Sequence, residues 1–371
     1  MRIKIQQFLF GKVHSWAFVG QNIGRSLLKL GHDVEFVSTD GMDPKFIPKD
    51  LLPHVRENPS GTYDCQISYT APLNWPNFLG YGTKNRFGIW NYEYNSKENS
   101  DQTLLVGFAK HAKALDKLLP SSNFSKDVFL SMRFPENKMV VIPHGFNKDE
   151  FDIISPYKLK TNKKKKILLN IAQPHLRKNI SKALEAYGLA FTRKDDVCLV
   201  AKVYIKNKTN MQFDVDFYSM LKRMKDKFPN HAEIEVVTDY VEKISDLYQA
   251  CDVNFSTTHV ECWHLPSLEA LAAGIVNVVP RYGGILDFCN DNNSLLIDGR
   301  LARSPKEHQY WSFNPFAVHF EADVNDAANK LHTAVYENQE LKDKFAQGSK
   351  SVLEQLTWDC VAMKILELCD G

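Results

Sequence analysis

Apolar runs and amphipathic segments alternate along the whole chain. In the first half, short runs rich in β-branched and aromatic residues predict strands at residues 3–8, 33–38, 64–69, 86–90, 114–118 and 139–142. The segment 17–30 instead repeats its apolar residues every three or four positions, and Gly31 follows it where glycine commonly ends a helix. Helices that alternate with short strands predict an α/β fold built on parallel sheets.

A second series of the same kind begins at Ile167. Its apolar runs predict strands at residues 167–172, 197–204, 234–237, 252–257, 275–279 and 294–297. Its amphipathic segments predict helices at residues 179–191, 218–227, 244–250, 266–273, 324–338, 339–354 and 357–368. The sequence therefore predicts two Rossmann-like halves, with the last three helices following the second.

A basic stretch separates the two series. Residues 156–166 contain several lysines and few apolar residues, as in a solvated linker or in a patch that binds nucleic acid. The whole chain has 46 basic and 44 acidic residues, a formal net charge of +2, so no strong field attracts nucleic acid or an anionic membrane. We therefore interpret the stretch as an interdomain linker and predict no nucleic-acid partner.

Composition and cysteine usage narrow the class of protein further. Of the 371 residues, 44% are hydrophobic and 24% are charged, as in folded globular proteins and unlike disordered chains. The seven cysteines form no C-x-x-C pair, which argues against a zinc site and a disulfide framework and favours a reducing compartment. We find neither a signal peptide nor an apolar run of eighteen residues, so we expect a cytoplasmic protein.

The largest group of candidate functional residues follows the predicted strand 252–257, at the strand end where open α/β sheets bind ligands. Glu261 lies in the loop, Pro266 stands at a favoured first helical position, and Glu269 falls in the opening turn of the helix. A helix start offers free backbone N–H groups that suit a phosphate or diphosphate. Each glutamate alone is explained by dipole compensation or by solvation. Together they could hold hydroxyl groups on either side of a bound anion.

The whole segment resembles a known motif. Residues 261–274 read Glu-Cys-Trp-His-Leu-Pro-Ser-Leu-Glu-Ala-Leu-Ala-Ala-Gly. They are similar to the segment E-G-F-G-L-P-x-x-E-A-M-A-x-G of retaining glycosyltransferases of the GT-B fold, family 4, the group 1 transferases. Besides both glutamates, the matching residues are Leu265, Pro266, Ala270, Ala272 and Gly274.

Other segments along most of the chain also resemble motifs of this family, and they occur in the same order as in the family. Residues 31–34 resemble the G-H-[ED]-V that opens the family's second strand, and residues 119–129 resemble its pS-x-f-s-x-x-v stretch. Residues 141–151 are similar to V-I-P-N-G-V-D-x-x-x-F, which ends the first domain. Residues 176–180 resemble the R-K-N turn at the start of the second domain, and residues 240–253 resemble the run into the strand before the glutamates.

The resemblance implies a fold and a reaction. Two Rossmann-like domains would face each other across a cleft: an acceptor-binding domain at 1–157 and a donor-binding domain at 158–355, with a last helix at 356–371 packing back on the first. The reaction would move a sugar from a UDP- or GDP-sugar to a hydroxyl of a glycan or other glycoconjugate, with retention of anomeric configuration. Family members need no metal or other cofactor for it.

The resemblance also implies roles for individual residues. Glu261 would contact hydroxyls of the donor sugar and stabilise positive charge at its anomeric carbon, and Glu269 would accept hydrogen bonds from the ribose. Lys178 and Arg177 would neutralise the diphosphate leaving group, because positioned cations stabilise the charge that accumulates there in the transition state. The remaining residues of the implied donor site are His264, Leu265, Pro266, Ser267 and Val241.

The chain departs from the family pattern in the donor half. Two glycines of the motif are Cys262 and His264 here, so side chains occupy a loop that usually lets the backbone approach the sugar. The arginine that commonly follows the first strand of the second domain is missing, which leaves Arg177 as its substitute.

Four residues of the first half are predicted to bind the acceptor. The family's glycine-rich first loop has one glycine here and offers His14 and Trp16 for stacking on a sugar; packing in the core is the alternative for Trp16. Tyr92 and Glu93 follow the predicted strand 86–90 and are expected to project toward the cleft.

The sequence gives less support to other functions. The D-x-D at residues 214–216 is interpreted as a solvated turn and not as a metal site, and neither a dinucleotide-binding nor a P-loop motif occurs. The replaced glycines and the missing arginine leave a non-catalytic or weakly catalytic nucleotide-sugar binder as the main alternative, with a nucleotide-sugar epimerase as a third. Peripheral contact with a membrane is also open, although no basic amphipathic helix in the N-terminal half supports it.

Overall fold

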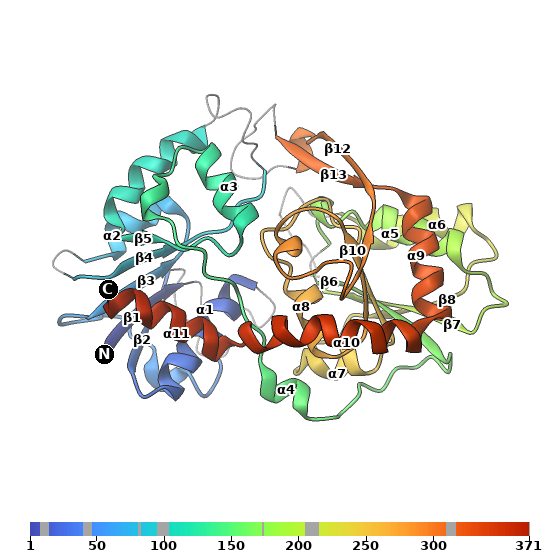
Figure 1. Cartoon of the computed structure of the whole chain (residues 1–371), viewed down its shortest axis with the longest axis horizontal. Coiled ribbons are helices and arrows are strands. Elements are labelled where there is room, and N and C mark those ends of the chain that lie inside the picture. Colours follow the sequence, from blue (N-terminus) through green and yellow to red (C-terminus); the bar gives the residue numbers. More distant parts are fainter. Residues whose placement is uncertain are drawn as a thin grey trace. The chain divides into compact units, whose positions relative to one another are not determined.

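The computed structural model describes residues 1–7, 15–39, 47–80, 83–94, 104–172, 174–204, 215–308 and 317–370. The chain divides into two compact units. The first consists of Met1–Asn147 together with Leu356–Gly371, and the second of Lys148–Gln355. Each unit has its own parallel sheet, drawn in blue to cyan for the first and in green to orange for the second (Figure 1).

Five parallel strands organise the first unit, in the order β2-β1-β3-β4-β5. The strands are β1 (Arg2–Gln7), β2 (Asp33–Ser38), β3 (Cys65–Tyr69), β4 (Arg86–Ile89) and β5 (Lys117–Leu118). The α-helices are α1 (Ser15–Lys29), α2 (Trp75–Phe78), α3 (Asn123–Ser131) and α11 (Trp358–Asp370). The strand predicted at 139–142 is reduced to one bridge between Leu118 and Met139.

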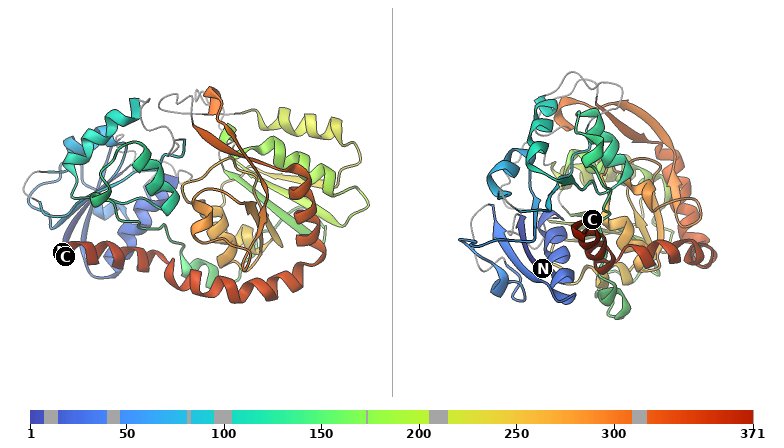
Figure 2. Two further views of the ribbon diagram at one scale, coloured as in Figure 1. Left: turned by 45° about the horizontal axis from the view of Figure 1, so that its top comes forward. Right: turned by 60° about the vertical axis from the view of Figure 1, so that its left-hand side comes forward.

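Helix α11 completes the first unit although it lies at the far end of the chain. It runs beside α1 in both views of Figure 2. Asp359 at its start accepts hydrogen bonds from Ser26 Oγ at 2.7 Å and Lys29 Nζ at 2.6 Å, both on α1. The rings of Phe18 and Trp358 meet edge to face, with centroids 6.1 Å apart. The last residues thus supply part of the core of the first unit.

Six parallel strands organise the second unit, in the order β11-β10-β9-β6-β7-β8. They are β6 (Lys165–Ala172), β7 (Val197–Val203), β8 (Glu233–Val237), β9 (Val253–Phe255), β10 (Val276–Pro280) and β11 (Leu295–Ile297). The helices are α4 (Lys148–Asp152), α5 (Ile180–Ala190), α6 (Phe217–Lys227), α7 (Ile244–Gln249), α8 (Leu265–Ala272), α9 (Val324–Tyr336) and α10 (Asn338–Gln355).

Alternation along the central strand β6 explains why helices cover both faces of this sheet. Ile167, Leu169 and Ile171 are buried in a cluster with α5, α6 and α9. Leu168, which points to the other face, is buried with residues of α7 and α8. Because both faces of β6 are buried, its sequence is almost continuously apolar.

Residues 156–166 do not form the solvated linker that was predicted. The backbone N–H of Tyr157 donates to Asp246 O at 2.8 Å, and that of Thr161 donates to the Glu235 carboxylate at 2.8 Å. Tyr157 and Leu159 also pack against the cluster that contains α7. A few apolar side chains are therefore enough to hold this lysine-rich stretch on the second unit, which begins at Lys148.

The second unit also contains a hairpin that the sequence pattern did not reveal. Strand β12 (Gly299–Arg303) pairs antiparallel with β13 (Val318–Ala322). Among the helices that the structure describes, none is long and apolar enough to cross a membrane.

Candidate functional site

Two loops at the carboxyl ends of the neighbouring strands β6 and β9 form the candidate site. The first contains the short 3-10 turn Leu176–Lys178, and the second contains Thr258 and Glu261. The carbonyl of Arg177 accepts hydrogen bonds from Thr258 Oγ1 at 3.0 Å and from the N–H of His259 at 2.9 Å. These bonds hold the loops together at the strand ends where parallel sheets bind ligands.

The three residues predicted to act in catalysis lie together here. Arg177 Nη1 lies 2.5 Å from Glu261 Oε2, and Lys178 Nζ lies 2.8 Å from Glu261 Oε1. Thr258 Oγ1, whose proton Arg177 O and this carboxylate share, lies 3.2 Å from Glu261 Oε1. The Glu261 side chain is only 9% exposed, so these ion pairs are shielded from solvent.

The charges of this cluster are fixed by their neighbours. Burial acts to raise the pKa of Glu261, but Arg177 and Lys178 overcome it and hold that pKa well below its ordinary value of 4.5. Burial lowers the pKa of His264 to about 3; Glu261 opposes the shift, and Lys178 and Arg177 reinforce it. Two cations, one carboxylate and a neutral imidazole leave one net positive charge, which suits an anionic ligand.

His264 holds the start of α8 in an unusual conformation. Its φ of 80° and ψ of 72° lie in the left-handed region, which glycine adopts readily and other residues adopt at a cost of roughly 1–2 kcal/mol. The motif that this segment resembles has glycine at this position, so the backbone keeps a glycine conformation although the residue is histidine. The imidazole Nδ1 lies 2.5 Å from Ser267 Oγ in the first turn of α8. Leu265 and Pro266, beside them, are half-buried.

Glu269 occupies a different electrostatic environment. Its side chain is 8% exposed and hydrogen-bonds the hydroxyl of Tyr248, which also accepts from Asn170 Nδ2 at 3.0 Å. Burial raises the pKa of Glu269 to about 7; the bond from Tyr248 lowers it in part, and the charge of Glu150 adds to the rise. The titration of this carboxyl is therefore moved toward neutral pH.

Val241, predicted in the donor site, is connected to this region through Tyr204. The backbone N–H of Val241 donates to the Tyr204 hydroxyl. Burial raises the pKa of Tyr204 to about 12, and the charge of Glu269 contributes to the rise. The Nζ of Lys202 lies 3.5 Å from the centroid of the Tyr204 ring and donates to Asp239 O at 2.8 Å. The sequence motifs did not reveal Tyr204, Tyr248 and Asn170. Asn170 and Tyr204 have only a polar group at or near a strand end as their signal, and Tyr248 lies within helix α7.

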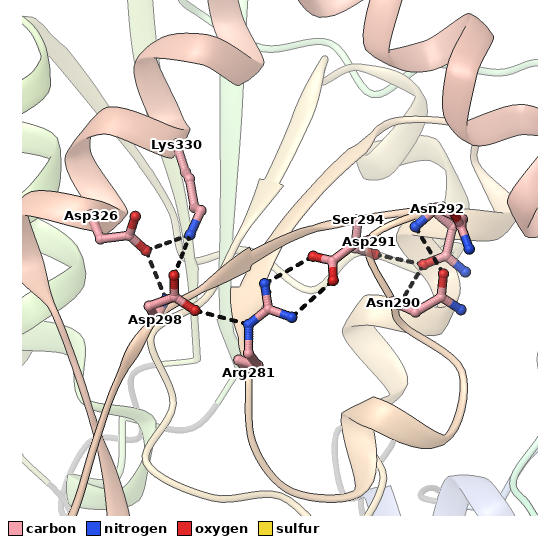
Figure 3. Close-up of polar contacts among 9 residues, drawn as sticks. Arg281, Asn290, Asp291, Asn292, Ser294, Asp298, Asp326 and Lys330 are labelled. Atoms are coloured by element: carbon pink, nitrogen blue, oxygen red, sulfur yellow. Dashed lines mark hydrogen bonds and ion pairs between the residues drawn. The ribbon is translucent and has the colours of Figure 1, made fainter.

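A third loop supports Glu261 from the end of β10. Gly283 has a φ of 87°, and a β-carbon there would lie 2.9 Å from Glu261 O. The N–H of Gly284 donates to the same oxygen at 2.8 Å. Arg281, at the start of this loop, binds both oxygens of Asp291 and contacts Asp298, which Lys330 also approaches (Figure 3). This surface network ties the loop to the segments before and after β11.

The first unit carries polar and aromatic groups at its own strand ends. Trp16, predicted to bind the acceptor, is half-buried and stacks on Tyr69 with centroids 5.6 Å apart. Asn91 Nδ2 donates to the Tyr69 hydroxyl at 2.8 Å and lies 3.4 Å from His144 Nε2. Burial lowers the pKa of His144 to about 3, so the imidazole is neutral.

Tyr92, predicted to contact the acceptor, lies in a buried aromatic cluster, and its contact with the acceptor stays a prediction. Its side chain is fully buried, and its ring stacks on Trp90 with centroids 5.6 Å apart. The adjacent Glu93 is 6% exposed, and its role stays a prediction. His14 lies outside the described residues.

One family model matches the sequence of the chain. Residues 153–310, all within the second unit, match the model described as glycosyl transferases group 1. This segment contains both loops of the candidate site and helix α8. No curated protein sequence matches the chain significantly.

Solved structures resemble the chain over its whole length. A glycosyltransferase from Rickettsia africae ESF-5 is 17% identical with a TM-score of 0.69, covering 99% of this chain and 98% of its own. Anabaena Alr3699/HepE, in complex with UDP and glucose, is 13% identical with a TM-score of 0.70, covering 100% and 99%. A UDP-forming α,α-trehalose-phosphate synthase from Burkholderia xenovorans is 11% identical with a TM-score of 0.70, covering 100% and 98%. At these identities the likeness establishes the fold, which is GT-B as predicted.

Proposed function

We propose that this protein is a retaining glycosyltransferase that moves a sugar, most simply a hexose, from a nucleoside diphosphate sugar to an acceptor hydroxyl. The observation that carries the proposal is the buried carboxylate of Glu261, held by Arg177 at 2.5 Å and Lys178 at 2.8 Å, eight residues before Glu269. Breaking a bond between a sugar and a diphosphate needs cations at the leaving group and negative charge near the anomeric carbon. This cluster supplies both.

The two cations can serve a diphosphate while they hold Glu261. A guanidinium has five N–H donors and an ammonium has three, and each of these side chains gives one bond of at most 2.8 Å to the carboxylate. The net positive charge of the cluster favours an anion, and buried cations stabilise the charge that grows on the phosphate oxygens. We therefore assign leaving-group stabilisation to Arg177 and Lys178, without a metal ion bridging the diphosphate.

The carboxyls have separate roles in this proposal. Because its pKa is held low, Glu261 stays ionised and can stabilise positive charge at the anomeric carbon. Glu269, with Tyr248 and the loop that carries Val241, would bind the ribose and base. His264, Leu265, Pro266 and Ser267 at the start of α8 would line the diphosphate and the sugar.

The comparisons suggest the donor to test first. One structure of similar fold was solved with UDP and glucose, and another belongs to a UDP-forming enzyme. We propose a UDP-sugar as donor, with GDP-sugars as the alternative, and a glycan or other glycoconjugate as acceptor. The proposed acceptor contacts, all in the first half of the chain, remain His14, Trp16, Tyr92 and Glu93. The seven cysteines are free, which agrees with the proposed cytoplasmic location.

The test measures nucleotide binding and turnover separately. At 100 times its Kd, the correct nucleoside diphosphate should stabilise the protein by about 2.7 kcal/mol in a thermal-shift series of UDP, GDP and ADP, and Glu269→Ala should abolish that shift. Hydrolysis of the matching nucleotide sugar without acceptor should fall on the order of 100-fold in Glu261→Gln. Glu233→Gln, on the exposed start of β8, is the matched control and should retain wild-type hydrolysis.

A nucleotide-sugar binder without catalysis is the second candidate. The observation that favours it is the complete burial of Cys262, Trp263 and His264, which fill a loop where the family motif has two glycines. A nucleotide shift combined with equal hydrolysis in the wild type and Glu261→Gln would support the binder and reject the transferase. No shift with any nucleotide would reject both.

A further inference from the structure

A second cluster of ligand atoms lies beside the loop that carries Glu261. It combines His259, two residues before Glu261, with His319 and Glu321 of β13. One ligand atom from each residue lies within 4.8 Å of the other two. Over the residues that the structure describes, no other three histidine, cysteine or acidic side chains meet in this way.

The geometry of the cluster is close to that of a zinc site. Glu321 Oε1 lies 2.5 Å from His319 Nε2 and 3.8 Å from His259 Nδ1. Tetrahedral zinc with bonds near 2.05 Å places neighbouring ligand atoms about 3.3 Å apart, so the Glu321 and His319 atoms would move apart to share one ion. The distance to His259 Nδ1 places that ring beside them but does not join two ligand atoms, because Nδ1 faces the carbonyl of Phe320. The imidazole rings are 4.4 Å apart and inclined by 66°, so modest side-chain rotations would aim all three groups at one point.

Burial and neighbouring charges also suit a bound cation. The side chains of His319 and His259 are 2% and 5% exposed, and that of Glu321 is 29% exposed. An ion could therefore enter from the Glu321 side and rest against two shielded imidazoles. The nearby cation Lys182 is itself paired with Glu185 at 3.3 Å, which offsets part of its repulsion of a metal.

We propose that His259, His319 and Glu321 bind one zinc ion. Imidazole nitrogen and carboxylate oxygen are both good zinc ligands, and a set of three leaves a fourth position for water. The carbonyl of Phe320 lies 2.8 Å from His259 Nδ1. It can support the ring from outside if His259 binds through its other nitrogen, an arrangement common around zinc.

The ion would brace the catalytic loop without taking part in the reaction. The hairpin already meets this loop through the N–H of Phe320, which donates to His259 O at 2.9 Å. A zinc ion would add a cross-link between the same two segments, one of which continues to Glu261. Its binding requires no nucleotide, so it can be tested whether or not the proposed transferase function holds.

The experiment uses the full chain without a histidine tag, stripped with a chelator and titrated with zinc chloride by calorimetry. We expect one zinc ion per chain with a Kd below micromolar and a rise in Tm. His319→Gln and Glu321→Gln should each weaken binding by at least tenfold. His231→Gln should not, because His231 forms a β-bridge with Thr192 elsewhere in the same unit. Far-UV circular dichroism checks that each variant is folded.

Cobalt(II) in place of zinc identifies the ligands. The visible bands of a tetrahedral nitrogen–oxygen site, lost in His319→Gln, would support the proposal. Thiolate-to-metal absorption would instead show that cysteines bind the metal and would overturn it. So would an absence of zinc binding to the wild type, or binding that is unchanged in folded His319→Gln and Glu321→Gln.

Discussion

Glu261 and Glu269 show how strongly the surroundings of a residue decide its chemistry. As whole residues they are almost equally buried, at 7% and 8% exposure, so desolvation acts to raise both pKa values. Two cations within 3 Å reverse that effect for Glu261, whereas Glu269 has a neutral phenol, Tyr248, as its hydrogen-bond partner. One glutamate is thus permanently charged, while the other titrates near neutrality.

Stability should therefore depend on the ionisation of Glu269. Its pKa is about 7 in the folded protein and 4.5 ordinarily, so between these values the folded state binds more protons than the unfolded state. The stabilising contribution is complete below about pH 4.5 and is lost as the pH rises through 7, a change on the order of 3 kcal/mol. We expect Glu269→Gln, which cannot ionise, to gain stability relative to wild type between pH 5 and pH 8.5.

The measurement is thermal unfolding of wild type, Glu269→Gln and Glu337→Gln at both pH values. Glu337 is exposed beyond the end of α9, so its variant should follow the wild type. An equal difference between Glu269→Gln and wild type at the two pH values would show that Glu269 keeps an ordinary pKa.

Local motifs identified only part of the site at the level of residues. Arg177, Lys178 and Glu261 were found because each falls in a recognisable segment that follows a strand. Tyr248 and the pair His259 and His319 were not, because their roles depend on partners far away in the sequence. The burial of Tyr92 was also not predicted, because an aromatic residue beside a strand end has the same local pattern whether it lies in the core or at a ligand.

Among the elements, the loop after β10 carries a strict requirement for glycine. Gly283 and Gly274 both have positive φ, but only at Gly283 would a β-carbon meet backbone atoms, 2.9 Å from Glu261 O. Gly274→Ala should lose roughly 1 kcal/mol from backbone strain alone. Gly283→Ala should lose more and also displace Glu261, so donor hydrolysis should fall in this variant and persist in Gly274→Ala. Denaturant unfolding and the hydrolysis assay check both effects; equal stability and activity would contradict the close approach.

Elements whose apolar residues show no regular spacing were not predicted, and the reason is physical. Strand β12 is mostly exposed and includes Arg300 and Arg303, so it shows no buried alternation. Its partner β13 begins fifteen residues later in the chain, and no short turn motif marks the pair. Residues 156–166 were predicted to be a linker because their many lysines suggest exposure to solvent, although Tyr157 and Leu159 pack against the second unit. The continuous apolar runs of both parallel sheets, by contrast, were predicted well.

At the scale of the molecule, Trp358 ties the end of the chain to the first unit. Its side chain is 4% exposed and contacts the rings of Phe18 and His144. Trp358→Ala should destabilise the first unit by about 3–5 kcal/mol, while the second unit, which shares none of these contacts, keeps its stability. Hydrogen exchange of β1–β5 and of β6–β11 reports on each unit separately. Trp263→Ala, which removes a buried side chain from the second unit, should destabilise the second unit and leave the first unchanged. Equal effects of either variant on both units would contradict the division of the chain into two units.

The position of α11 at the end of the chain also affects how the protein folds during its synthesis on the ribosome. The second unit is one unbroken stretch, whereas the first needs residues from both sides of it. Domains usually mature from the N-terminus as they are synthesised, at about 5–20 residues per second. Here the five strands of the first unit emerge early but wait for more than two hundred residues before α11 can cover α1. The unit that is made first is thus completed last, and α1 lacks its packing against α11 until synthesis ends.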